Sequence, residues 1–136
     1  MKEPKPRYVT SKAIEELSKE LNLRYEQWMQ DWPYEVVAVG DIEKYIAHYK
    51  TTVDEDKKFV LMMAIIHATT GQRQETDFEK YWNIIKPLLI DDYSIHEYSI
   101  FYWSTFEIDD LTDCWIITPK MRQLWHDIQN EKESRM

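Results

Sequence analysis

Glycine is rare in this chain, with only Gly40 and Gly71 among 136 residues. All-β proteins and nucleotide-binding α/β proteins need many glycines in turns and phosphate loops, so this scarcity favours a helical fold. The length fits one domain, and hydrophobic residues make up 43% of the chain, including six tryptophans and nine tyrosines. Disordered chains lack this aromatic content, so we expect a folded core.

Helical spacing of apolar residues begins near the N-terminus. A cap at Thr10 or Ser11 predicts a first helix that runs to Trp32 and is stopped by Pro33. Its apolar stripe consists of Ile14, Leu17, Leu21, Tyr25, Trp28 and Trp32. Residues 34–39 are β-branched and predict a short strand or an extended link. Asp41 is the expected cap of a short helix whose buried face holds Ile42, Tyr45, Ile46 and Tyr49.

Three segments match the capping box, in which a Ser or Thr hydroxyl and a Glu carboxylate each accept a backbone N–H at a helix start: residues 52–55, 76–79 and 94–97. The first predicts a helix to Thr70 with Gly71 as its left-handed end, apolar on all sides and therefore the most buried. The helix after Thr76 is expected to be kinked or ended by Pro87, with a stripe of Phe78, Tyr81, Trp82, Ile85 and Leu89.

The third box predicts a helix from Ser94 to about Trp103, although the aromatic, partly alternating residues 98–106 also fit a strand. Thr118 with Pro119 then predicts a last helix with a stripe of Met121, Leu124, Trp125 and Ile128. The chain therefore predicts a single all-α domain over residues 1–136, a bundle of about six helices with flexible ends at 1–9 and 130–136.

The charge of the chain is concentrated in one segment. The net charge is −8, and residues 87–119 hold seven acids, seven aromatic residues and no Lys or Arg. A solvated face usually mixes both signs, and aromatic anchors inside a charged rim are typical of protein interfaces. Both interpretations stay open for any single residue: aromatic residues in the core with acids on a solvated face, or an interaction surface.

The densest part is FEIDDLTDCW, residues 106–115, which raises the question of a metal, a diphosphate or a positively charged partner. We predict a surface that binds a basic protein. Its candidate partner-binding residues are Asp91, Asp92, Glu97, Tyr98, Tyr102, Glu107, Asp109, Asp110 and Asp113. Any of Tyr98, Tyr102 and Trp103 that is exposed would anchor the partner, and reversing Asp109, Asp110 and Asp113 to Lys would abolish binding.

Catalytic and metal motifs are incomplete. DDLTD at 109–113 has the DDxxD spacing of prenyl-diphosphate enzymes, but those enzymes need a much larger helical cavity, and an EF-hand needs a turn glycine and a twelfth-position Glu that are missing here. HEYSI at 96–100 lacks the second His of a zinc protease. We therefore expect no catalytic residues, no metal site and no cofactor, while a small enzyme or ligand binder stays a third alternative.

The single cysteine, Cys114, excludes an internal disulfide and is expected to be a small buried residue, since acidic neighbours disfavour its thiolate. The polar N-terminus predicts no signal peptide, and the longest apolar run, residues 59–66, is too short to span a bilayer. The negative charge disfavours direct binding to nucleic acid or to an anionic membrane. These features predict a cytoplasmic protein.

Three segments carry a resemblance to a known class of proteins: DEDKKFVLMMAIIHAT at 54–69, YWNIIKPLLIDDYSIHEYSIFYWS at 81–104 and WIITPKMRQLW at 115–125. Together they resemble small, acidic, helical bacterial immunity proteins, which neutralise the toxins of polymorphic or contact-dependent systems. The resemblance implies inhibition by binding, often over the basic active-site cleft of a nuclease, and no catalytic residues. A helical adaptor without a link to toxins is the alternative.

Overall fold

The computed structural model describes residues 3–29 and 31–134, and within these residues every regular element is a helix. The α-helices are α1 Ser11–Leu21, α2 Trp32–Glu35, α3 Ile42–Thr51, α4 Glu55–Thr70, α5 Glu75–Asp91, α6 Tyr93–Ser104 and α7 Thr118–Ser134. Two 3₁₀ turns, η1 Val39–Asp41 and η2 Leu111–Asp113, complete the described part. The predicted all-α fold is confirmed.

The chain divides into two compact units. One unit consists of residues 7–95, and the other combines the described residues before position 7 with those from His96 onwards. Helix α6 begins in the first of these units and continues into the second.

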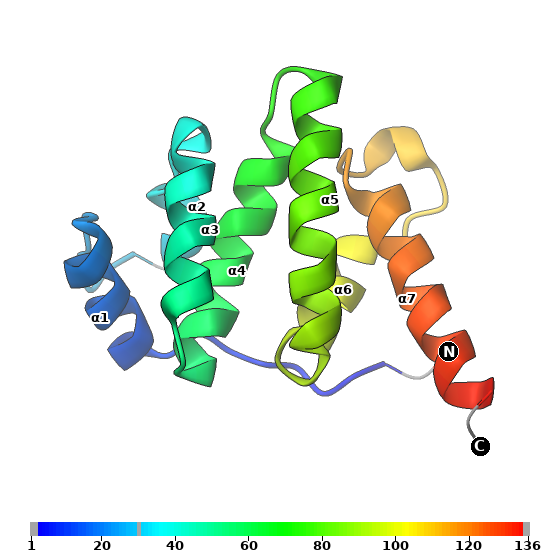
Figure 1. Ribbon diagram of the computed structural model, residues 1–136, viewed down its shortest axis with the longest axis horizontal. Coiled ribbons are helices and arrows are strands. Elements are labelled where there is room, and N and C mark those ends of the chain that lie inside the picture. The colour runs from blue at the N-terminus through cyan, green and yellow to red at the C-terminus, as the bar shows by residue number, and fades with distance from the viewer. Residues whose placement is uncertain (1–2, 30, 135–136) are drawn as a thin grey trace. The chain divides into compact units, whose positions relative to one another are not determined.

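Helix α4 forms the core of the unit of residues 7–95. It contacts α1, α2, α3 and α5 (Figure 1). Because partners surround it, nine of its residues are buried: Phe59, Val60, Leu61, Met62, Ala64, Ile65, Ile66, Ala68 and Thr69. A helix that is apolar on all sides has no face suited to water, so its burial follows directly from its sequence. The prediction that this helix is the most buried is confirmed.

The predicted first helix is too long. Thr10 does cap α1, where its side chain accepts a hydrogen bond from the backbone N–H of Ala13, but the helix ends at Leu21. Asn22 follows in the left-handed conformation with φ 54°, a geometry that Asn adopts more readily than most residues and that ends a helix. Pro33 does not stop a helix; it lies in the first turn of α2, where a missing N–H costs little.

Residues 34–39 form no strand: they include the end of α2 and the start of η1. Asp41 takes the N-cap position of α3, although its side chain makes no capping hydrogen bond. The predicted inner face of α3 is confirmed, because Ile42, Tyr45, Ile46 and Tyr49 are all buried.

The capping boxes are displaced from the true helix starts. Asp54, not Thr52, caps α4 by accepting from the backbone N–H of Lys57, and the Thr52 hydroxyl instead donates to the carbonyl of His48. Helices α5 and α6 begin at Glu75 and Tyr93, so Thr76 and Ser94 lie inside them. An aspartate carboxylate is a strong N-cap acceptor, and it outcompetes the threonine two residues earlier.

Two further helix ends differ from expectation. Gly71 has φ −81°, so the end of α4 is not left-handed as predicted. Pro87 lies within α5, which continues to Asp91 and is therefore not ended there. The predicted stripe of α5 is buried at Phe78, Trp82, Ile85 and Leu89, while Tyr81 is half-buried.

His67 on α4 gives this unit a predicted pH dependence. Its ring packs against Tyr34 of α2, with ring centroids 5.2 Å apart, and partial burial lowers the pKa of His67 below its usual 6.5. The unfolded chain then binds a proton more readily than the folded chain, so stability is lost as the pH falls below about 6.5.

Replacing His67 with Phe keeps an aromatic ring beside Tyr34 and removes the titration. We expect the variant to lose less free energy of unfolding than the wild type between pH 7.5 and pH 5.5 in urea titrations; equal losses would contradict this.

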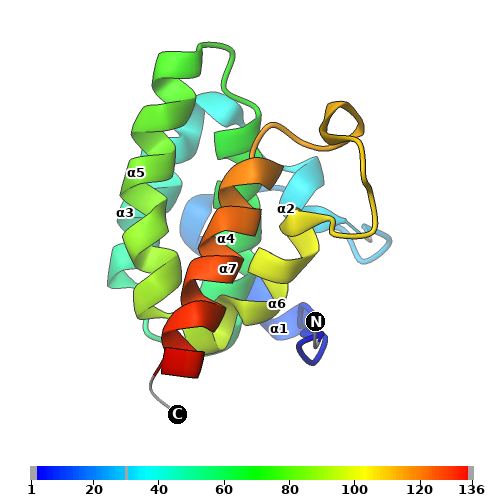
Figure 2. The same cartoon turned by 90° about the vertical axis from the view of Figure 1, so that its right-hand side faces the viewer.

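In the unit of residues 96–134, the end of α6 packs against the start of α7. The ring of Phe101 lies 5.3 Å from that of Trp125, and the Thr118 hydroxyl donates to the carbonyl of Trp103 at 2.9 Å. The buried side chains of this unit include Ile100, Trp103, Ile117, Met121, Leu124 and Trp125. Ile128, also predicted for the stripe of α7, is half-buried. Figure 2 shows the two helices with the gold loop that arches between them.

The choice between helix and strand at 98–106 is decided, because α6 is helical to Ser104. The same sequence is nearly apolar around the helix, and such a helix buries most of its circumference. At the C-terminus, α7 extends through Ser134, so residues 130–134 are helical where a flexible end was expected. Positions 1–2 and 135–136 of the predicted flexible ends lie outside the described residues.

Candidate protein-binding surface

The loop of residues 105–117, here called the acidic loop, starts with a sharp turn at the end of α6. Thr105 has φ 41°, a left-handed conformation that costs a residue with a β-carbon about 1–2 kcal/mol. The turn continues with a hydrogen bond from the N–H of Ile108 to the carbonyl of Thr105, at 3.0 Å. Such a turn needs compensating contacts, and α7 supplies them.

Arg122 of α7 holds the first part of the acidic loop. Its guanidinium donates to three backbone carbonyls: Ser104 at 2.7 Å, Thr105 at 2.8 Å and Ile108 at 2.7 Å. The last carbonyls of a helix have no partner within the helix, and a charged donor there also interacts favourably with the helix dipole. Arg122 lies outside residues 87–119, the segment without Lys or Arg. The charge pattern of the sequence therefore gave no reason to single out Arg122.

The middle of the loop is shaped by Asp110. Its carboxylate accepts the backbone N–H of Thr112 at 2.9 Å and the Thr112 hydroxyl at 2.8 Å, and η2 follows. The backbone bond from Thr112, followed by the hydroxyl bond, lowers the pKa of Asp110 below its usual value. A side chain that folds back onto the next turn in this way fixes the loop locally.

Cys114 links the two parts of the loop. The Thr105 hydroxyl donates to its Sγ at 3.3 Å, and the thiol donates to the carbonyl of Asp110 at 3.7 Å. The expectation of a buried cysteine is wrong, because Cys114 is only half-buried.

The outer side of the acidic loop carries four exposed carboxylates, those of Glu107, Asp109, Asp110 and Asp113. Within residues 3–29 and 31–134, no Lys, Arg or His forms an ion pair with any of the four. Some acids elsewhere in the described part do pair with a cation, such as Glu16 with Lys57 at 3.4 Å. The outer side of the loop therefore carries negative charge that no ion pair within the described residues neutralises.

Large exposed apolar side chains occur in the same segment as these carboxylates. Eight large apolar side chains are exposed in the described part of the chain, and four lie between positions 102 and 116: Tyr102, Leu111, Trp115 and Ile116. Exposed apolar residues scattered singly are ordinary, but here half of the total lie within 15 residues of sequence, at the end of α6 and on the acidic loop. Sequence reasoning missed Leu111, Trp115 and Ile116, because nothing in their local pattern distinguishes them from core residues.

Tyr102 and Trp115, here called the aromatic pair, lie with ring centroids 5.7 Å apart. Trp103 packs beneath Trp115 at 4.3 Å and is only 3% exposed, so Trp103 cannot anchor a partner. Tyr98 is half-buried, with its ring 6.3 Å from that of Tyr102. Of the three aromatic residues proposed from sequence as anchors, Tyr102 is the exposed one.

The nine candidate residues do not all belong to one unit. Glu97, Tyr98, Tyr102, Glu107, Asp109, Asp110 and Asp113 lie in the unit of residues 96–134, whereas Asp91 and Asp92 lie in the other. Asp91 is exposed. The seven residues on α6 and the acidic loop are the candidate surface.

Asp92 is engaged within its own unit. Its carboxylate accepts a hydrogen bond from the buried Tyr49 hydroxyl at 2.6 Å and pairs with Lys58 at 3.1 Å. Burial, and then the hydrogen bond to Asp92, raise the pKa of Tyr49 well above its usual range. Asp92 thereby connects α3 and α4 to the end of α5, which gives this carboxylate a structural role.

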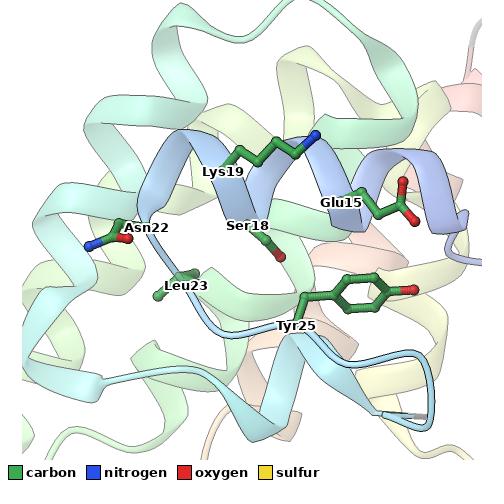
Figure 3. Close-up of a pocket in the computed structure, with 6 residues that line it drawn as sticks. All are labelled: Glu15, Ser18, Lys19, Asn22, Leu23 and Tyr25. Carbon is green, nitrogen blue, oxygen red and sulfur yellow. The ribbon is translucent and has the colours of Figure 1, made fainter.

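A pocket of about 420 Å³ lies along α1 and the loop that follows it (Figure 3). Its lining residues are Glu15, Ser18, Lys19, Asn22, Leu23 and Tyr25. The lining contains one carboxylate and no histidine, so it lacks the convergent acid and histidine side chains that a hydrolytic or metal-assisted site requires. Within the described residues, no group of three or more His, Cys, Asp or Glu is placed to hold a metal ion.

Comparison of the chain with protein-family models, with curated proteins and with solved structures found no match in any of the three. Among the described helices, none combines the length and the apolar character needed to cross a membrane.

Proposed function

We propose that this protein is an immunity-type inhibitor that binds a basic toxin domain through the acidic loop and the aromatic pair. The observation that carries the proposal is the presence of four exposed carboxylates without internal ion pairs on the same loop as exposed apolar side chains. The resemblance of three sequence segments to helical immunity proteins supports the same assignment.

The proposed mechanism is occupation of a positively charged cleft. A nuclease lines its active site with Lys and Arg to hold phosphates, and a carboxylate-rich loop presents similar negative charge. Complementary charge accelerates association, while exposed apolar residues such as Trp115 and Ile116 lose water on binding and slow dissociation. We place this inhibition in the cytoplasm, where a nuclease toxin meets its nucleic-acid substrate.

The test replaces charge on the loop without disturbing its shape. Asp110 holds the turn through Thr112, so we leave it intact and replace Glu107, Asp109 and Asp113 with Lys. The side chains of these three exposed residues make no hydrogen bond or ion pair within the described chain, so folding should be preserved. We expect tagged wild-type protein to retain a basic partner from a lysate of its source cells, less at high salt, and the variant to lose at least 100-fold in affinity for that partner.

A matched control reverses three exposed acids elsewhere, Glu15, Glu35 and Glu133, and changes the net charge by the same amount. This control variant should retain the partner. Equal retention of the partner by the loop variant and the wild type would exclude the acidic loop as the interface. The inhibitor assignment further requires that the captured partner arrest the growth of a host cell unless the chain is co-expressed.

A helical adaptor that binds a non-toxic partner is the second candidate. The exposure of Leu111, Trp115 and Ile116 on the acidic loop favours it equally, because exposed apolar residues serve protein interfaces of many kinds. Growth of the host cell distinguishes the two candidates, since an adaptor's partner would be harmless when expressed alone.

A further inference from the structure

The aromatic pair offers exposed ring surface, and Trp115 belongs to the same loop as the four carboxylates. Tyr102 is 45% exposed and Trp115 is 38% exposed, and their ring planes are inclined by 31°. Trp103 supports both rings from the buried side, with centroids 4.3 Å from Trp115 and 6.0 Å from Tyr102. The rings are therefore held in place before any partner arrives, which lowers the entropy cost of binding.

Other aromatic rings of the chain already carry a cation of their own. Arg24 lies over the ring of the exposed Trp28 at 5.6 Å, and Lys80 lies over Tyr81 at 5.1 Å. Within the described residues no Lys or Arg lies over Tyr102 or Trp115. Arg122 of α7, the cation that holds the start of the acidic loop, lies over the ring of Phe106 instead, at 5.6 Å.

An exposed indole next to unpaired carboxylates is suited to a guanidinium. The planar face of an arginine side chain stacks on an aromatic ring while its N–H groups donate in the plane to carboxylates. Asp113, exposed and two residues before Trp115, is the nearest acid along the chain. A lysine ammonium is more strongly hydrated and has no planar face, so it gains less from the same surface.

We propose that the aromatic pair is a recognition site for an arginine side chain of the basic partner, with the carboxylates of the acidic loop as its hydrogen-bond acceptors. This inference rests on the proposed function, since it names the residue type by which the partner is recognised. A nucleobase would also stack on these rings, but the charge of the loop repels the phosphates that come with it.

The test uses two defined probes of equal charge, a nona-arginine peptide and a nona-lysine peptide, added to the full-length protein at low salt. Tryptophan fluorescence and calorimetry measure both affinities. We expect the arginine peptide to bind about 5- to 10-fold more tightly than the lysine peptide. In the double variant Tyr102→Leu, Trp115→Leu this preference should disappear while both peptides still bind.

Two variants control for loss of aromatic surface in general. Tyr102→Phe keeps a ring in the pair and should keep the preference. Trp28→Leu removes an exposed tryptophan that is already paired with Arg24 and should also keep it. Circular dichroism confirms that each variant retains the helical content of the wild type.

The outcomes separate this inference from the function on which it rests. Equal binding of the two peptides by the wild type, or a preference that survives the double Leu variant, would overturn the arginine site. In either case, loss of peptide binding by the variant with Lys at Glu107, Asp109 and Asp113 would still show that the acidic loop is the binding surface. If neither peptide bound the wild type, the arginine site would fail, and retention of the basic partner by the wild type and by the triple Lys variant would still decide whether the acidic loop is the binding surface.

Discussion

Replacing Arg122 with Met is expected to lower the free energy of unfolding by about 3 kcal/mol, because charged hydrogen bonds contribute about 1.5–3 kcal/mol each and their buried acceptors are left without a donor. Met has a similar length and keeps most of the packing, so the loss reports on the guanidinium. The carbonyls of Ser104 and Thr105 belong to residues that are 0% and 6% exposed, and water does not readily replace the lost donor there.

Chemical denaturation measures this change, and hydrogen exchange shows where it acts. The backbone N–H groups of Ile108, Asp113 and Cys114, which are hydrogen-bonded within the loop, should exchange faster in the Met variant. Arg122→Lys should recover part of the stability, because an ammonium keeps the charge but cannot reach three carbonyls in one plane.

Arg73 provides the matched control, since it is an exposed arginine and its replacement by Met should change the free energy of unfolding by less than about 0.5 kcal/mol. An effect of Arg122→Met no larger than that of Arg73→Met would show that the acidic loop holds its shape without the guanidinium. The triple Lys variant changes the carboxylates of the acidic loop and keeps Arg122, which holds its conformation. The Met variant removes Arg122 and keeps all four carboxylates, so the two variants test the charge and the conformation of the loop separately.

Replacing Ile65 with Ala is the second change with a large expected effect. Ile65 lies in the middle of α4 and is 0% exposed, so truncation removes apolar contacts and leaves a cavity, at a cost of about 2–5 kcal/mol. Urea denaturation should show a lower midpoint with an unchanged slope, since the surface exposed on unfolding stays nearly the same.

Ile116→Ala is the matched control, because it removes the same atoms from a side chain that is 53% exposed. We expect its free energy of unfolding to stay within about 0.5 kcal/mol of the wild type. The effects on partner binding should be reversed. Ile116→Ala should weaken binding, whereas the Ile65→Ala variant, at temperatures where it is still folded, should bind the partner as the wild type does. Destabilisation by both changes would mean that Ile116 belongs to the core and would remove it from the candidate surface.

Helical periodicity allowed the main elements to be predicted, while their ends depended on single residues. The inner face of α3 and the all-round burial of α4 follow from spacing alone, because a helix must cover its apolar faces. The first helix was predicted 11 residues too long, since the aromatic spacing continues to Trp32 although Asn22 turns the chain at Leu21. The Trp32 indole N–H donates to the carbonyl of Arg24 at 2.7 Å, a contact between positions that helical spacing does not pair.

The candidate surface likewise combines a property of the sequence with properties that depend on folding. The concentration of acids in residues 87–119 is a property of the sequence, because charge and its order along the chain do not depend on folding. Which aromatic side chains remain exposed does depend on folding: Trp103 and Trp115 belong to the same segment, yet one is 3% exposed and the other 38%. Local pattern cannot separate them, since both are tryptophans among apolar neighbours.

The sequence by itself determined that this chain is helical, that one apolar helix would be the most buried, and that its negative charge would be gathered before the last helix. Only the tertiary structure decided which residues shape and line the surface. Arg122 reaches the acidic loop from α7, and Trp115 is left exposed beside Tyr102, because helix packing brings together residues that are distant along the chain. Exposure and hydrogen bonding are set by those contacts, and no local pattern of residues contains them.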